Sequence, residues 1–145
     1  MSLKLLGKLV EWTEVGMNKE FVKKFMDGKS KLRETFKDAP PTTYDQIVRA
    51  VIDIINPHDE PYLPSLYNFH IIDDGDYQGT IVYIIGEADY QPSNYWYVKV
   101  EYGSCSVCDT LLAIQEDITG SPTSEQLDAY MTLALYIVQG LKELV

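Results

Sequence analysis

Features that would point to export or to a membrane are scarce in this chain of 145 residues. No apolar run approaches the roughly 18–20 residues that a membrane span requires. The N-terminus shows neither the long uncharged apolar segment nor the small-residue cleavage site of a signal peptide. The chain has only two cysteines. We therefore expect a cytoplasmic protein without a membrane span, in which two cysteines are more often thiols than a disulfide.

Motifs of nucleotide binding and of serine hydrolysis are also missing. The sequence contains no G-x-x-x-x-G-K-[ST], no G-x-G-x-x-G and no G-x-S-x-G, the patterns that cradle phosphates or present a serine nucleophile. There are two histidines, and neither is an obvious base for Ser104 or Ser106. The sequence therefore favours a protein without catalytic residues.

Basic residues nearly disappear after residue 40. The net charge is −10, with 12 Lys and Arg against 22 Asp and Glu. Residues 1–40 hold nine basic and six acidic residues, a balance of +3, whereas residues 41–145 hold three basic and sixteen acidic ones, a balance of −13. We interpret these parts as a basic helical arm (1–40) and an acidic core domain (41–145). Such a body repels nucleic acid, so we expect a protein partner or a homo-oligomer instead.

What the chain does contain suits one globular core, since 46% of its residues are hydrophobic and 12% aromatic. Helical spacing predicts helices over 3–15 and 19–37, the second capped by Asn18, and a break at 38–41. The T-x-x-Q box at 43–46 predicts a helix to residue 55, followed by an irregular segment over 58–68.

Alternating apolar and polar residues then predict three strands over 68–73, 80–87 and 95–102. A helix over 106–115 and a buried helix from 123 toward Leu144 follow. We expect an α+β fold in which a three-stranded antiparallel meander packs against the helices.

In such a meander the turn after the first strand lies beside the end of the third. The sequence therefore predicts a functional corner formed by Asp73, Asp74, Asp76, Tyr77, Gln78, Tyr102, Gly103, Ser104, Cys105, Ser106, Cys108 and Asp109.

Several chemistries fit this corner. The first is structural, with turn aspartates and a helix cap of Ser106 and Asp109. A C-x-x-C pair at a helix start is also typical of reactive thiols, although carboxylates nearby oppose the thiolate. Because the aspartates favour a cation over a phosphate or a thiolate, a structural corner or a cation site is the better interpretation.

A metal site is the second alternative for the corner. Cys105, Cys108, His70 and Asp76 are candidate zinc ligands. Asp73, Asp74 and Asp76 are candidates for calcium or magnesium, but they lack the rest of an EF-hand loop.

Two segments of the corner carry a family resemblance. Asp74–Thr80 (DGDYQGT) and Tyr102–Leu111 (YGSCSVCDTL) resemble motifs of small, uncharacterised phage and prophage proteins of Gram-positive bacteria, of staphylococcal type. The likeness covers roughly residues 42–140, and Val107 stands where that pattern has a glycine. The resemblance implies a phage-encoded accessory or interaction protein in the host cytoplasm, and it implies no catalytic residue. The alternatives are the metal or thiol site and an acidic mimic of nucleic acid that binds a host protein.

Overall fold

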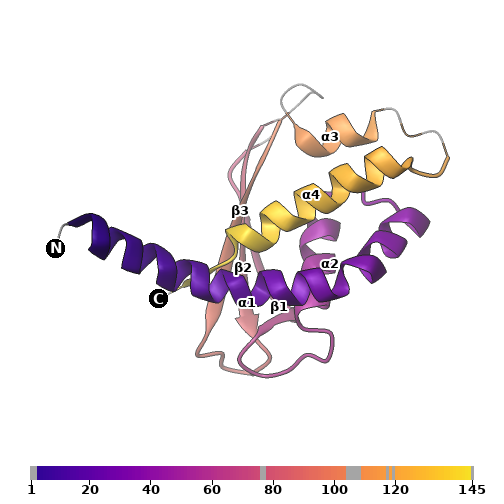
Figure 1. Ribbon diagram of the computed structural model, residues 1–145. Helices are drawn as coiled ribbons and strands as arrows, with labels where there is room; N and C mark the ends of the chain where they lie inside the picture. Colours follow the sequence, from indigo (N-terminus) through magenta and orange to yellow (C-terminus); the bar gives the residue numbers. More distant parts are fainter. Residues whose placement is uncertain (1–2, 76–77, 104–108, 117, 119, 145) are drawn as a thin grey trace.

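The computed structural model describes residues 3–75, 78–103, 109–116, 118 and 120–144, with side chains from residue 19 onward (Figure 1). The helices are α1 (Leu3–Asp38), α2 (Tyr44–Ile55), α3 (Thr110–Gln115) and α4 (Ser124–Gly140). The strands are β1 (Pro64–Asp73), β2 (Gly79–Glu87), β3 (Tyr95–Tyr102) and β4 (Lys142–Leu144). They form one antiparallel sheet in the order β1-β2-β3-β4. The predicted α+β fold is confirmed, with four strands in place of three.

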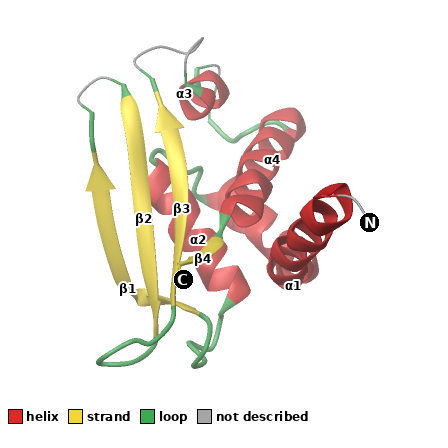
Figure 2. Cartoon of the chain, turned by 90° about the vertical axis from the view of Figure 1, so that its left-hand side faces the viewer, coloured by secondary structure: helices red, strands yellow, loops and turns green. Residues whose placement is uncertain are grey.

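The helices lie on one side of the sheet, and no described segment covers its other side (Figure 2). The alternation predicted for β3 is confirmed, because Trp96, Val98 and Val100 are buried whereas Lys99 and Glu101 are exposed. The buried side chains of β3 meet a core that all the long helices share. Its other members are Phe21, Phe25, Leu32, Phe36, Tyr44, Ile47, Val48, Val51, Ile52, Ile55, Tyr83, Ile85, Leu111, Ile114, Leu127, Tyr130, Leu133, Ala134, Ile137, Val138 and Leu141.

The prediction of two N-terminal helices was wrong, since α1 is one helix of 36 residues. Gly16 and Asn18 each lower helix stability by only about 1 kcal/mol or less, and no proline interrupts the segment. Asn18 is therefore an internal residue and not a cap. Nowhere in the described parts of the chain is a helix long and apolar enough to cross a membrane.

The two T-x-x-Q boxes do begin helices. The Thr43 hydroxyl accepts a hydrogen bond from the Gln46 N–H at the start of α2, and Thr123 forms a complete capping box with Gln126 at the start of α4. The predicted end of α4 was wrong, because the helix stops at Gly140 and the chain continues as β4. The short β4 pairs with the first residues of β3.

The first strand also differs from its prediction, since β1 begins at Pro64 and not at Asn68. Proline is tolerated at the first position of an edge strand, where its missing N–H is not needed. The register between β1 and β2 shifts between Pro64 and Phe69, and it is regular from Phe69↔Ile85 to Asp73↔Ile81. The regular part of β1 therefore coincides with the strand expected from the sequence.

Candidate functional site

The predicted neighbourhood of the first turn and the end of β3 is confirmed for the described residues. Gly79 lies opposite Tyr102 in the β2–β3 ladder. The Tyr102 hydroxyl donates a hydrogen bond of 2.7 Å to Asp73 Oδ1 on β1, so it spans the width of β2. Gln78 is described and exposed, whereas six residues of the corner lie outside the described residues: Asp76, Tyr77, Ser104, Cys105, Ser106 and Cys108.

The aspartates of the turn hold the backbone of the turn itself. Asp74 Oδ1 accepts from the Thr80 N–H at 2.7 Å, and Asp73 Oδ1 accepts from the Gly75 N–H at 3.1 Å. A Cβ atom added at Gly75 would lie 2.0 Å from the carbonyl oxygen of Gln78, so the closed turn requires glycine there. These contacts are those of a structural turn.

Among the described carboxylates of the corner, Asp109 is the most enclosed, with 6% of its surface exposed. Its Oδ1 accepts from the Tyr44 hydroxyl at 2.8 Å and from the Leu112 N–H at 3.1 Å, and its Oδ2 accepts from the Gly103 N–H at 2.9 Å. Asp109 is thus the N-cap of α3. The prediction that this helix begins at Ser106 was wrong, because α3 begins only at Thr110, directly after the residue that satisfies its N–H groups.

Tyr44 links this cap to α2. Its hydroxyl donates to Asp109 and accepts from the Leu111 N–H at 3.2 Å. Burial raises the pKa of Tyr44 to about 12, and the neighbouring Asp109 carboxylate acts in the same direction. The phenol therefore stays protonated at neutral pH and serves as a hydrogen-bond bridge from α2 to the start of α3.

The metal predictions are not tested by the structure. Within the described ranges, no three His, Cys, Asp or Glu side chains come together as a metal site would require. His70 is exposed in the middle of β1, opposite Ile84. Because Cys105, Cys108 and Asp76 lie outside the described residues, the zinc, calcium and magnesium sites stay predictions.

At the opposite end of the sheet, Glu87 forms a second buried carboxylate site that the sequence did not indicate. Its Oε1 accepts from the N–H groups of Ser93 and Asn94 at 2.9 and 3.3 Å, and its Oε2 from the Tyr62 N–H at 3.2 Å and the Asn94 side chain at 3.1 Å. These hydrogen bonds, led by that of Ser93, hold the pKa of Glu87 below its usual range. The carboxylate fastens the β2–β3 turn to the loop before β1.

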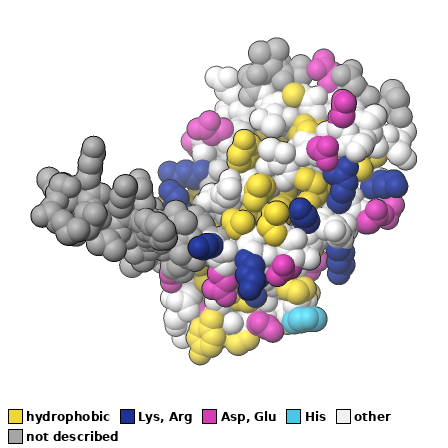
Figure 3. Space-filling view, in the orientation of Figure 1, with side chains coloured by type: hydrophobic (Ala, Val, Ile, Leu, Met, Phe, Trp, Pro, Cys, Tyr) yellow, Lys and Arg dark blue, Asp and Glu magenta, His cyan; other side chains and the backbone are white. Residues whose placement is uncertain are grey.

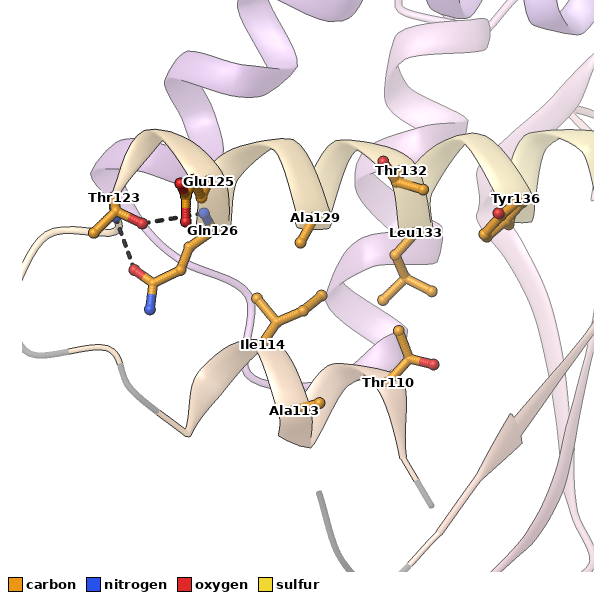
Figure 4. A pocket seen from close by; sticks show the side chains of 10 residues that line it. All are labelled: Thr110, Ala113, Ile114, Thr123, Glu125, Gln126, Ala129, Thr132, Leu133 and Tyr136. Carbon is orange, nitrogen blue, oxygen red and sulfur yellow. Dashed lines mark hydrogen bonds between the residues drawn. The ribbon is translucent and has the colours of Figure 1, made fainter. Parts of the chain in front are cut away.

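A groove of about 730 Å³ lies between α3 and α4. In Figure 4 Ile114 and Leu133 lie between the two helices, and Ala113 and Ala129 add small side chains to the lining. Glu125 is the one acidic side chain among its described lining residues. This groove has the character of an apolar surface furrow and does not present an acid–base pair.

The outer edge of β1 has no neighbouring strand among the described residues, as Figure 2 shows. The Asp74 N–H donates to the Thr80 carbonyl, which makes Asp74 and Thr80 a hydrogen-bonded pair. Hydrogen-bonded and non-hydrogen-bonded pairs alternate in an antiparallel ladder. The N–H and C=O groups of Phe69, Ile71 and Asp73 therefore point away from β2, toward the outer edge.

This edge exposes large side chains to solvent. Tyr67 is 85% exposed, Ile72 55% and Ile71 47%. The edge is already engaged before Phe69, since the Tyr67 N–H donates to the Ser65 hydroxyl and Arg49 donates to the Leu66 carbonyl. The unpaired part of the edge consequently runs from Asn68 to Asp73.

Comparison of the whole chain with family models, with curated proteins and with solved structures finds no match.

Proposed function

We propose that this protein is a non-catalytic interaction protein that takes up an extended segment of a partner protein as an additional strand on β1. The observation that carries this proposal is the row of outward backbone groups on Phe69, Ile71 and Asp73 beside exposed apolar side chains. Strand addition of this kind draws its affinity from main-chain hydrogen bonds and its selectivity from alternate side chains.

The composition of the edge supports the same conclusion. Proteins commonly protect an edge strand from other chains with lysine, proline or a covering segment. The run Tyr67–Ile72 (YNFHII) contains neither lysine, arginine nor proline, and no described helix lies over its outer edge (Figure 2). An edge of this composition is suited to receiving a strand.

The roles of the corner carboxylates support a non-catalytic protein. Asp73, Asp74 and Asp109 each hold backbone N–H groups or a tyrosine hydroxyl of this chain. The origin in a phage and the action in a host cytoplasm rest on the motif resemblance alone and stay predictions.

The surface charge favours this proposal over the acidic mimic. On the face that α1 and α4 present, Asp and Glu are interspersed with Lys and Arg and do not form a stripe (Figure 3). A mimic of nucleic acid requires rows of carboxylates that follow the spacing of phosphates.

The test uses the full-length protein and the uncharged peptide Ac-Ser-Thr-Val-Thr-Val-Thr-Ser-NH2, followed by NMR of the backbone amides. We expect weak binding that shifts and protects the amides of Phe69, Ile71 and Asp73. Ile71→Pro removes an outward N–H and should weaken binding at least tenfold, whereas Ile71→Val keeps that N–H and should bind as the wild type does. Binding that Ile71→Pro leaves unchanged, or shifts confined to the α3–α4 groove, would overturn the proposal.

A stability comparison checks the assignment of the outward groups without any ligand. Proline at position 71 leaves the β1–β2 ladder intact and should cost about 1 kcal/mol, whereas proline at position 72 removes a ladder hydrogen bond and should cost about 3 kcal/mol or more. Equal losses of unfolding free energy for Ile71→Pro and Ile72→Pro in urea would show that the outward and inward backbone groups of β1 are assigned wrongly.

A further inference from the structure

We infer that the segment received by β1 is basic at both of its ends and apolar at alternate positions between them. This inference rests on the proposed strand addition and names the chemistry of the partner. It follows from the charges and the aromatic side chains at the two ends of the edge.

At the start of the edge, Asp59 and Asp89 line a hollow of about 520 Å³ together with Tyr67 and Tyr90. Tyr90 is 96% exposed and Tyr67 85%. Asp59 Oδ1 accepts from the Ser65 hydroxyl at 2.6 Å, and Asp89 Oδ1 accepts from the Gln91 N–H. The Oδ2 atoms of both aspartates have no partner among the described residues. Two carboxylates beside tyrosine rings suit an ammonium or guanidinium group, through ion pairing and through cation–π contact.

At the end of the edge, Asp73 and Asp74 are both exposed. Their Oδ1 atoms hold the turn, and their Oδ2 atoms have no partner among the described residues. Arg49 packs on Phe69 of β1, with 4.3 Å between its guanidinium and the ring centre, but it is already paired with Asp45 at 2.9 Å. The described part of the chain therefore leaves the carboxylates at both ends of the edge without a cation.

The spacing of the two acidic ends fits a short extended segment. Asp73 lies six positions after Tyr67, and a strand rises about 3.3 Å per residue, so the ends lie roughly 20 Å apart. A segment of seven residues spans this length. Since both ends of the edge are acidic, a segment with basic residues at both ends fits in the parallel and in the antiparallel direction.

Between the ends, the edge offers apolar neighbours on both faces of the sheet. Ile71 lies on the same face as Phe69, whereas Ile72 lies on the uncovered face with His70. Cross-strand neighbours contribute most to the stability of a pair of strands when apolar side chains meet. Alternating β-branched residues in the incoming segment therefore match the middle of the edge.

A second copy of this chain fits the edge less well than a basic segment does. If two β1 strands paired antiparallel about His70, Asp73 of the second copy would stand opposite Tyr67, beside Asp59 and Asp89 of the first. Like charges would then meet at both ends, and two chains of net charge −10 also repel each other at longer range. The charge of the edge thus selects a basic partner.

The test adds Ac-Lys-Thr-Val-Thr-Val-Thr-Lys-NH2 and its glutamate-ended counterpart to the neutral peptide used above. We expect the lysine-ended peptide to bind full-length protein about tenfold more tightly than the neutral one, as two partly screened ion pairs would give. The glutamate-ended peptide should bind more weakly than the neutral one. The preference should shrink in 0.5 M salt, because ions screen exposed charges.

The double variant Asp59→Asn, Asp89→Asn localises the effect. It should reduce the preference for the lysine-ended peptide about threefold and leave the affinity for the neutral peptide unchanged. The control Glu125→Gln in the α3–α4 groove should change neither the preference nor that affinity.

Equal binding of all three peptides would overturn the inference of a basic partner and leave strand addition standing, and binding of none of them would overturn both proposals. Sedimentation that shows a dimer in the wild type and a monomer in Ile71→Pro would assign the edge to a second copy and overturn the basic partner.

Discussion

Replacing Asp109 with alanine removes a side chain that joins the end of β3, the start of α2 and the start of α3. Its carboxylate accepts from the Gly103 N–H, the Tyr44 hydroxyl and the Leu112 N–H at 2.8–3.1 Å. Alanine at this buried position leaves all three donors without their acceptor, and water reaches them poorly because Asp109 is 6% exposed.

The loss of stability can be worked out donor by donor. The cap of α3 contributes about 1 kcal/mol. A buried hydroxyl and a buried N–H that lose their acceptor cost roughly 1–2 kcal/mol each. Asp109→Ala should therefore lower the free energy of unfolding by about 3–5 kcal/mol. Asp109→Asn keeps one acceptor oxygen but places an amide near the Gly103 N–H, so about 1–3 kcal/mol should be lost.

Urea unfolding followed by circular dichroism measures these losses, with an unchanged denaturant slope as the sign that the transition stays two-state. Tyr44→Phe supplies the matched variant, since it removes the hydroxyl and keeps the buried ring. The double variant with Asp109→Ala should lose about 1 kcal/mol less than the sum of the two single changes. A loss below 1 kcal/mol for Asp109→Ala, or strict additivity with Tyr44→Phe, would refute the structural role.

Two further predictions concern pH. Burial raises the pKa values of Tyr44 and Tyr83 to about 12. Because an unfolded tyrosine ionises near a pKa of about 10, the contribution of these two tyrosines to stability should be full below about pH 10 and should be lost between about pH 10 and 12. Ionisation of all eleven tyrosines in one step near pH 10, measured by ultraviolet absorbance, would contradict this. The lowered pKa of Glu87 predicts stability that is present above the ordinary range of a glutamate and lost as the pH falls through the folded-state pKa. Glu87→Gln should reduce the urea midpoint at pH 7 and flatten the acid-side decline, and an unchanged acid profile would count against the four-donor site.

The sequence predicted those parts of the fold that depend on neighbouring residues. Alternation identified β3 with its observed bounds, and the threonines of both T-x-x-Q boxes begin helices. Prediction from the sequence failed where an element depends on residues that are distant along the chain. The Lys142–Leu144 segment has no strand pattern of its own, and it becomes β4 only because it pairs with the start of β3. The continuity of α1 was missed because Asn18, a residue type that commonly caps helices, was interpreted as the N-cap of a second helix.

The corner was predictable in its neighbourhood but not in its contacts. Reversal of the strands places Gly79 opposite Tyr102, and the similar lengths of β2 and β3, nine and eight residues, bring both to the same end of the sheet. The partner of Asp109, however, is Tyr44, which lies 65 residues earlier at the start of α2. Glu87 was missed for the same reason, since its donors come from two loops and one of them is Tyr62.

The residues that suggest a metal site or a reactive site in the sequence differ from the residues whose backbone groups lack a partner in the described structure. Asp73, Asp74 and Asp109 each direct one or both carboxylate oxygens to donors of their own chain. The run Tyr67–Ile72 has no chemical signature, yet every second residue of its regular part presents an outward N–H and C=O. Whether a strand is an edge depends on the order of the whole sheet, and that order is decided by all of its strands together. An open edge of this kind is therefore visible only after the fold is known, and the role that we propose for the acidic residues at its ends is one that their sequence positions do not suggest.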